Sequence, residues 1–113
     1  MTIGEFIELT GSRLLTKDVD LDTQITCGYS CDLLSWVMSH GASGMAWVTV
    51  QTHMNVIAVA TLMDMSAVIV PENIAVEQEV VDKAGEEGIA LISSEKTAYA
   101  LCGMMYAAGV KSN

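Results

Sequence analysis

Hydrophobic and polar positions follow one theme four times along the chain. Each repeat begins with a short β-branched or apolar run, passes through a small polar turn and continues with apolar residues at helical spacing. The four runs are predicted strands at residues 24–28, 45–50, 66–70 and 89–93. The segments after them are predicted helices at residues 32–39, 53–62, 76–87 and 95–108, and a helix (residues 3–10) and a short strand (residues 13–15) precede the array.

Alternating strands and helices predict a sheet of parallel strands joined by right-handed crossovers. Three of the predicted strands read MAWVTV, SAVIV and IALIS, and such unbroken apolar runs are typical of central strands that are covered on both faces. A chain of 113 residues is the size of one domain. We therefore expect residues 1–113 to form a single three-layer α/β domain, with about five mainly parallel strands and helices on both faces.

The most hydrophobic stretch, residues 48–70, reads VTVQTHMNVIAVATLMDMSAVIV and is nearly long enough to cross a membrane. A membrane helix there would hold Gln51, His53, Asn55 and Asp64 in lipid, which is costly. If the stretch forms a strand, a helix and a second strand, the same polar residues fall at the junctions between these elements. We therefore predict that this segment does not span a membrane.

The helix MNVIAVATL inside this stretch is apolar nearly all round. Such a helix needs cover on the side away from the sheet as well as on the sheet side. The predicted helix at residues 76–87 differs, because its apolar residues lie on one face and its charges elsewhere. A second copy of the chain is the natural cover, so we predict a homodimer. The last predicted helix, with Met104, Met105 and Tyr106, is a second candidate for an oligomer face.

The charge of the chain is strongly unbalanced, with 14 acidic residues against 5 basic ones and a net charge of -9. Such a chain repels phosphate backbones and anionic lipids, so we predict no nucleic-acid partner and no membrane partner. Three cysteines are an odd number, and the acidic start MTIGEFIELTG does not resemble a secretory leader. We expect reduced thiols and a cytoplasmic protein.

Polar residues gather at the predicted carboxyl ends of the strands. Ligands bind at these ends in α/β sheets, because helix amino-termini point their free N–H groups there. We expect the turns to meet on one rim that binds a small polar or phosphorylated ligand, although the same residues also suit helix caps and turns alone. The candidate ligand-binding residues are Ser30, Thr49, Gln51, Thr52, His53, Asn55, Ser93 and Ser94.

His53 is the one candidate for acid–base chemistry. Imidazole titrates near neutral pH and could serve as an acid or base on a phosphate or acyl substrate. No Asp or Glu adjoins it in the sequence to orient the ring. The simpler interpretation is a histidine at a helix start whose ring bonds a backbone group, so we predict no catalytic residue and keep the enzyme as an alternative.

The cysteines do not form a recognised metal or redox motif. Cys27 and Cys31 are spaced C-x₃-C, whereas redox motifs use C-x-x-C and zinc ribbons use paired short spacings. Cys102 lies alone in a predicted helix and suits core packing. The GASG linker at residues 41–44 lacks the Gly-Lys-Ser/Thr ending of a phosphate loop. We predict no metal and no cofactor, and a thiol switch at Cys31 stays open.

Four segments, CDLLSWVM, AWVTVQTHMNVIAVA, AVIVPEN and LISSEKTAYAL, resemble the DRTGG domains. These domains occur alone, in the amino-terminal part of HPr kinase/phosphorylase-like proteins and inserted in some CBS-containing pyrophosphatases. The resemblance covers most of the chain after Ile7. It implies a compact α/β domain, often self-associating, without established catalytic activity. Single-domain members tend to accompany redox enzymes and signalling kinases, which implies a regulatory partner of that kind.

The chain departs from the family at both of the turns that characterise it. A Gly-Asp-Arg turn would lie at residues 51–53, where this chain has Gln-Thr-His, and a Thr-Gly-Gly turn near residues 71–73, where it has Pro-Glu-Asn. The functions of those turns are therefore not carried over to this chain. The sequence is similar to a diverged, stand-alone member of the family.

We interpret the chain as a non-enzymatic regulatory or binding module, homodimeric, that senses a small ligand or docks a partner protein such as a redox enzyme or signalling kinase. Two alternatives stay open, a small enzyme that uses His53 and a purely structural adaptor. Replacement of His53 by Ala should abolish turnover in an enzyme, but only weaken ligand-induced thermal stabilisation in a sensor. No metabolite should stabilise an adaptor.

Overall fold

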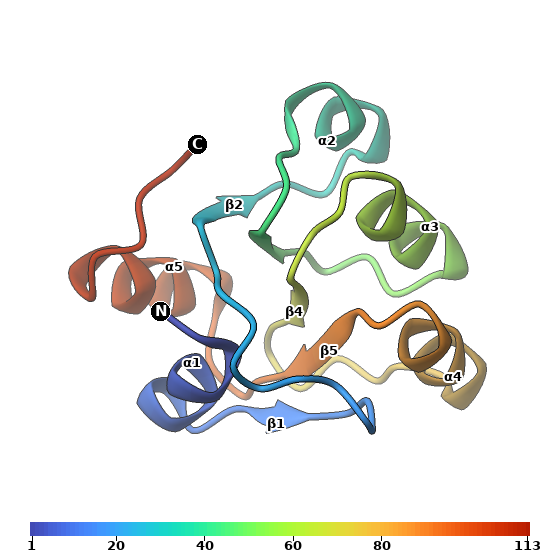
Figure 1. Cartoon of the computed structure of the whole chain (residues 1–113), viewed down its shortest axis with the longest axis horizontal. Coiled ribbons are helices and arrows are strands. Elements are labelled where there is room, and N and C mark those ends of the chain that lie inside the picture. The colour runs from blue at the N-terminus through green and yellow to red at the C-terminus, as the bar shows by residue number, and fades with distance from the viewer.

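The computed structural model describes all residues from Met1 to Asn113 and contains five helices and five strands, with the termini as marked in Figure 1. The strands are β1 (Arg13–Leu14), β2 (Cys27–Ser30), β3 (Met45–Val48), β4 (Ala67–Val70) and β5 (Ala90–Ser93). The helices are α1 (Ile3–Thr10), α2 (Leu34–His40), α3 (Met54–Leu62), α4 (Gln78–Glu86) and α5 (Ala98–Ala107). Every predicted element is present, and the differences lie at element ends.

The largest difference is at β2, which begins later than predicted. Gln24 forms an isolated antiparallel bridge with Thr2, and Ile25 donates its N–H to the Met1 carbonyl at 2.8 Å. These bonds hold residues 24 and 25 against the start of α1 instead of against β3. The ladder with β3 starts only where Cys27 lies opposite Met45.

The sheet is mainly parallel, as predicted, in the order β1-β5-β4-β3-β2. Strands β2 to β5 are parallel neighbours, and the two-residue β1 pairs antiparallel with β5 at one edge. The strand order follows the chain from β2 to β5 in one direction. Right-handed crossovers therefore place α2, α3 and α4 on one face, and α1 and α5 cover the other, as Figure 1 shows.

Two hydrophobic cores follow from this layering, one on each face of the sheet. Side chains alternate along a strand, so Trp47, Val68 and Leu91 pack with α2, α3 and α4. Val48 and Ile92 belong to the second core, with Phe6 of α1 and Leu101 of α5. All residues of β3, β4 and β5 are buried, which confirms the expectation from their unbroken apolar runs.

Local chemistry fixes the elements at both ends of the chain. The side chain of Thr2 accepts the Glu5 N–H and Glu5 accepts the Thr2 N–H, which forms a capping box at the start of α1. Gly44 has a φ of +78°, and a Cβ there would lie 2.5 Å from the hydroxyl oxygen of Thr26. Only glycine fits this turn, which leads the chain into β3.

The longest apolar segment of the sequence thus becomes β3, α3 and β4. None of the helices has the combination of length and hydrophobicity that a membrane span requires.

Candidate functional site

The carboxyl ends of β2 to β5 lie along one rim, and the loop after β3 supplies most of the predicted site. Gln51, Thr52 and His53 lie in this loop, with His53 as the N-cap residue of α3 in an extended conformation. Its ring makes no side-chain cap hydrogen bond. Asn55 lies two residues further, exposed in the first turn of α3. The predicted division of residues 48–70 into strand, loop and helix is therefore correct.

Thr49 is buried and has a structural partner. Its hydroxyl donates to the Asp32 carboxylate at 2.9 Å, and the Val50 N–H donates to the same oxygen at 3.0 Å. The Gln51 N–H in turn donates to the Thr49 hydroxyl at 3.2 Å. These bonds tie the loop after β3 to the segment that precedes α2. Thr49 therefore supports the rim loop, and the Asp32 carboxylate bonds this loop while Leu33, the N-cap residue of α2, makes no side-chain cap bond.

Ser93 and Ser94 are also buried, at the carboxyl end of β5. The Ser93 hydroxyl accepts from the Arg13 guanidinium at 3.2 Å, and the Ser94 hydroxyl accepts from the Lys96 N–H at 3.2 Å. The Ser94 carbonyl accepts the Asn73 N–H at 2.8 Å, which joins this turn to the one after β4. The Ser93 side chain therefore bonds β1, the Ser94 side chain stabilises its own turn, and the Ser94 carbonyl joins two loops of the rim.

One pocket of about 280 Å³ lies on the rim between the starts of α3 and α4, and it contains two predicted residues, Thr52 and His53. The other wall contains Glu77, the N-cap residue of α4, and Glu79 in its first turn, which belong to the charges of the helix predicted at residues 76–87. Parallel topology could have placed them here, because the helix after β4 starts beside the one after β3. Two carboxylates repel phosphate and favour a neutral polar or amine-bearing ligand.

The remaining predicted residues do not share this pocket. Ser93 ends β5 and Ser94 follows it. Strand β4 lies between β5 and β3, so at the usual spacing of strands these residues lie about 10 Å from the loop after β3. Ser30 lines a separate groove against α5, and Asn55 lines an apolar groove between α2 and α3. The predicted set therefore shares a rim without sharing one cavity.

The turn after β4 has an unusual backbone. Glu72 and Asn73 have φ angles of +59° and +54°, in the left-handed region that favours glycine. The DRTGG resemblance aligns this turn with Thr-Gly-Gly. The chain therefore uses a backbone that suits two successive glycines while it carries Glu and Asn.

The outer surface of α2 and α3 exposes large apolar side chains, and the polar residues between them are Ser35, Ser39, His40, Asn55 and Thr61. No Asp, Glu, Lys or Arg occurs from residue 33 to residue 63. Leu33, Trp36 and Leu62 are 61%, 52% and 69% exposed, and Met38 and Met54 lie beside them. Grooves of about 300 Å³ flank α3 on both sides: the one toward α2 is apolar, and the one toward α4 is bordered by the Lys83–Glu87 ion pair. We call this surface, from Leu33 to Leu62 on the two helices, the α2–α3 face.

Helix α5 is less apolar on its outside than the sequence suggests. Met105 is buried in the core beneath it. The outer surface instead presents Tyr99, which is 91% exposed, and Tyr106, whose ring lies under the Lys111 ammonium at 4.3 Å from the centroid. A cation lies over this surface, so it is a poorer oligomer face than the α2–α3 face.

The three cysteines are free thiols. Cys27 is buried beneath the α2–α3 side of the sheet, and Cys31 is half-buried ahead of α2 with its thiol near the Leu33 carbonyl at 3.8 Å. Burial raises the pKa of the Cys102 thiol, and a hydrogen bond with Ser30 partly offsets this. A raised pKa keeps the Cys102 thiol protonated, which makes it a weak nucleophile.

Comparison with known proteins identifies a structural relative. The fold is similar to that of the CBS and DRTGG domains in the regulatory region of Clostridium perfringens pyrophosphatase, which was solved with its activator, diadenosine tetraphosphate. The TM-score is 0.75 at 8% sequence identity, and the match covers 92% of this chain and 45% of the other. The chain thus spans about half of that regulatory region.

No protein-family model matches the chain, and neither does any curated protein sequence. At 8% identity the structural likeness establishes the fold, a three-layer α/β domain of the kind found in that regulatory region.

Proposed function

We propose that the chain is a non-enzymatic regulatory module of the DRTGG type that self-associates into a homodimer through the α2–α3 face. The single observation that carries this proposal is the uncharged, apolar α2–α3 face in a chain of net charge -9. The fold likeness to a regulatory region and the glycine-type turn at Glu72 and Asn73 support the DRTGG assignment.

The charge distribution favours a second copy as the occupant of the α2–α3 face. Two chains of net charge -9 repel each other, so they associate best through a surface that carries none of the acids. A basic partner protein would instead prefer the acidic surface of α4, which carries Glu79, Asp82 and Glu86. The uncharged face therefore suits a copy of the same chain.

The shape of the face also suits a symmetric helix pair. Met54, Ala58 and Leu62 are spaced four residues apart, so they form one ridge along α3. Ala58 is exposed at the middle of this ridge, where a small side chain permits close approach of a second helix. The apolar groove between α2 and α3 can receive the Leu62 or Met54 side chain of the partner copy.

The pocket at His53 is the proposed ligand site of the module. It lies at the amino-terminal end of α3, the helix whose outer surface forms the dimer ridge. A ligand that binds one arrangement of this helix start more tightly shifts the dimer population toward that arrangement. Glu77 and Glu79 favour a neutral polar or amine-bearing ligand over a phosphorylated one.

Sedimentation velocity at micromolar concentration tests the homodimer. We expect twice the 12.0 kDa mass of one chain for the wild type. Leu62→Glu places a carboxylate on the α2–α3 face and should give a monomer. Leu9→Glu is the matched control, because Leu9 is 43% exposed on α1, on the opposite face of the sheet. A wild-type monomer, or equal effects of the two variants, contradicts the proposed interface.

One observation favours the enzyme alternative. Glu77 and Glu79 share the pocket with His53, and a carboxylate beside a histidine is the arrangement that orients a general base. Turnover of a phosphate or acyl ester that His53→Ala abolishes would establish the enzyme. A polar amine or neutral metabolite that raises the melting temperature of the wild type, and raises it less in His53→Ala, would establish the sensor.

A further inference from the structure

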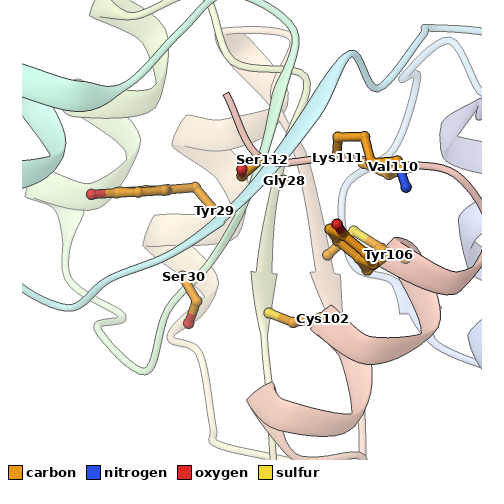
Figure 2. A pocket seen from close by; sticks show the side chains of 9 residues that line it. Gly28, Tyr29, Ser30, Cys102, Tyr106, Val110, Lys111 and Ser112 are labelled. Atoms are coloured by element: carbon orange, nitrogen blue, oxygen red, sulfur yellow. The ribbon is translucent and has the colours of Figure 1, made fainter.

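A groove of about 220 Å³ lies on the other face of the sheet, between the edge strand β2, α5 and the carboxyl-terminal tail. Figure 2 shows Ser30 on the strand and Cys102 on the helix facing each other across it, with Tyr106 and Lys111 further along. Tyr29 contributes only its backbone, because its ring packs with the core on the opposite face. The groove is separate from the His53 pocket and from the α2–α3 face.

Gly28 lines this groove, and its backbone conformation does not require a glycine. It lies in the middle of β2, where glycine weakens a strand, and its φ is not in the left-handed region. A Cβ at this position would lie 3.7 Å from both Met105 and Val110, an ordinary contact distance. Alanine would therefore fit, and the absent side chain leaves a space of one methyl group between the strand and the buried side chains of Met105 and Val110.

The tail forms the third wall and is anchored through its backbone. The outward N–H of Gly28 donates to the Lys111 carbonyl at 2.9 Å, and Ser112 forms a parallel bridge with Gly28. Alternate residues of a strand present their N–H groups to the same side, so the next outward N–H along β2 belongs to Ser30. The groove therefore offers main-chain polar groups along one wall and apolar side chains below.

Lys111 supplies the only positive charge among the residues that line the groove. Its ammonium lies over the Tyr106 ring, and all the ion pairs of the structure involve Lys83 instead. In a chain with five basic residues and a net charge of -9, a cation without a carboxylate partner beside an apolar groove suits an anionic ligand group. Cys102 adds a neutral, half-buried wall, and the groove has no carboxylate to repel an anion.

We propose that this groove binds a small monocarboxylate with a compact apolar or aromatic body. The body lies beside Gly28, in the part of the groove between Cys102 and Tyr106, and the carboxylate accepts from the Lys111 ammonium. The outward N–H of Ser30 is a further donor at the strand wall, whereas the Ser30 hydroxyl bonds the Cys102 thiol. The ring of Tyr106 and the sulfur of Met105 favour an aromatic body.

Titration of the full chain with phenylacetate, followed by amide NMR, tests the proposal. We expect saturable shifts of the Gly28 and Ser30 amides. The neutral isostere phenylacetamide should bind about tenfold more weakly, because it loses the charge-assisted bond. No saturable shift of these amides at any attainable phenylacetate concentration overturns the proposal.

Variants at Lys111 separate a specific contact from a general charge effect. Lys111→Met should weaken phenylacetate binding about tenfold, and Lys111→Arg should retain it. Lys17→Met is the matched control, because it makes the same change in net charge near β1, the opposite edge of the sheet. Equal weakening by Lys111→Met and Lys17→Met overturns the proposed carboxylate contact.

The variant Gly28→Ala separates an effect on ligand binding from an effect on the stability of the fold. The added methyl group makes ordinary contacts and reduces the freedom of the unfolded chain, so the melting temperature should rise. The same methyl group fills the space that glycine leaves beside the proposed ligand, so phenylacetate binding should weaken. Unchanged binding in this variant shows that the ligand does not lie beside Gly28 and overturns the proposed site. None of these outcomes depends on the dimer or on the His53 pocket.

Discussion

Helices α3 and α4 are neighbours on the same face of the sheet, yet they present opposite surfaces. Each has nine residues and follows a buried strand. Helix α4 buries Val80 and Ala84 and exposes a charged surface, on which Lys83 pairs with Glu87 at 2.9 Å. Helix α3 carries no charged residue and leaves Leu62 69% exposed.

This difference separates the surface that is stable in contact with water from the surface that would be stabilised by contact with another molecule. The charged side of α4 is fully solvated, so the helix is stable as it stands. Helix α3 buries one side on the sheet and leaves an apolar ridge on the other, which water does not stabilise. The two helices therefore distinguish the free surface of the domain from its proposed interface.

The largest effect should come from the buried side of α3. Ile57 is 1% exposed, and Ile57→Ala should lower the free energy of unfolding by about 3 kcal/mol, through lost burial and a new cavity. Urea denaturation at several protein concentrations measures this. Leu62→Ala, on the other side of the same helix, should lower stability only at concentrations where the wild type is dimeric. An equal, concentration-independent loss in both variants would remove the distinction between the two sides.

The next effect concerns how salt acts on the proposed dimer. Because each copy carries a net charge of -9 and the α2–α3 face carries none, added salt screens repulsion without breaking ion pairs. The dimer dissociation constant should therefore fall when sodium chloride is raised from about 20 mM to about 200 mM. Sedimentation equilibrium measures it. Weaker association at high salt would indicate an interface built on ion pairs, such as those of α4.

A smaller effect is expected at the turn that separates β4 from α4. Glu72 has a φ of +59°, so Glu72→Gly should raise the free energy of unfolding by about 1 kcal/mol, as the relief of backbone strain outweighs the added freedom of the unfolded chain. Thermal denaturation measures the change. The control is Ala75→Gly, at an exposed position outside the left-handed region, which should destabilise. Destabilisation by Glu72→Gly would mean that the Glu72 side chain has a role of its own.

The smallest effect should come from the charged surface of α4. The hydrogen bond and charge of Glu87, with a smaller contribution from Glu86, raise the pKa of Lys83 above its ordinary value of 10.5. Because the folded-state pKa is the higher one, this contribution is complete below pH 10.5 and disappears as the pH rises through the raised value. NMR titration of the Lys83 side chain should show the shift, and Glu87→Gln should reduce it. Both groups are exposed, so little change in stability is expected.

The fold was accessible from the sequence because its strands are buried on both faces. The runs that form β3, β4 and β5 are almost entirely apolar and are separated by helical patterns with clear ends. The sequence therefore predicted which segments are strands and helices, and that the strands pair in parallel. The start of β2 could not be predicted, because the bridge between Thr2 and Gln24 joins segments that no local pattern connects.

The candidate site was only partly accessible for a similar reason. The rim and the position of His53 follow from topology, but which side chains share a pocket depends on strand order and side-chain direction. Glu77 and Glu79 look like ordinary solvent-facing acids in the sequence, and only the adjacency of β3 and β4 brings them to His53. The groove above Gly28 joins β2 to the last part of the chain, and no periodicity in the sequence signals it.

Both edge strands of the sheet offer few free backbone groups for pairing with another strand. β1 is only two residues long, and the tail pairs with β2 at Gly28. Exposed strand edges are where folded domains join one another into fibres. A domain this rich in apolar residues is thereby kept from extending its sheet into a neighbouring molecule. Loss of the pairing between the tail and β2 would expose one edge and make the chain prone to precipitation.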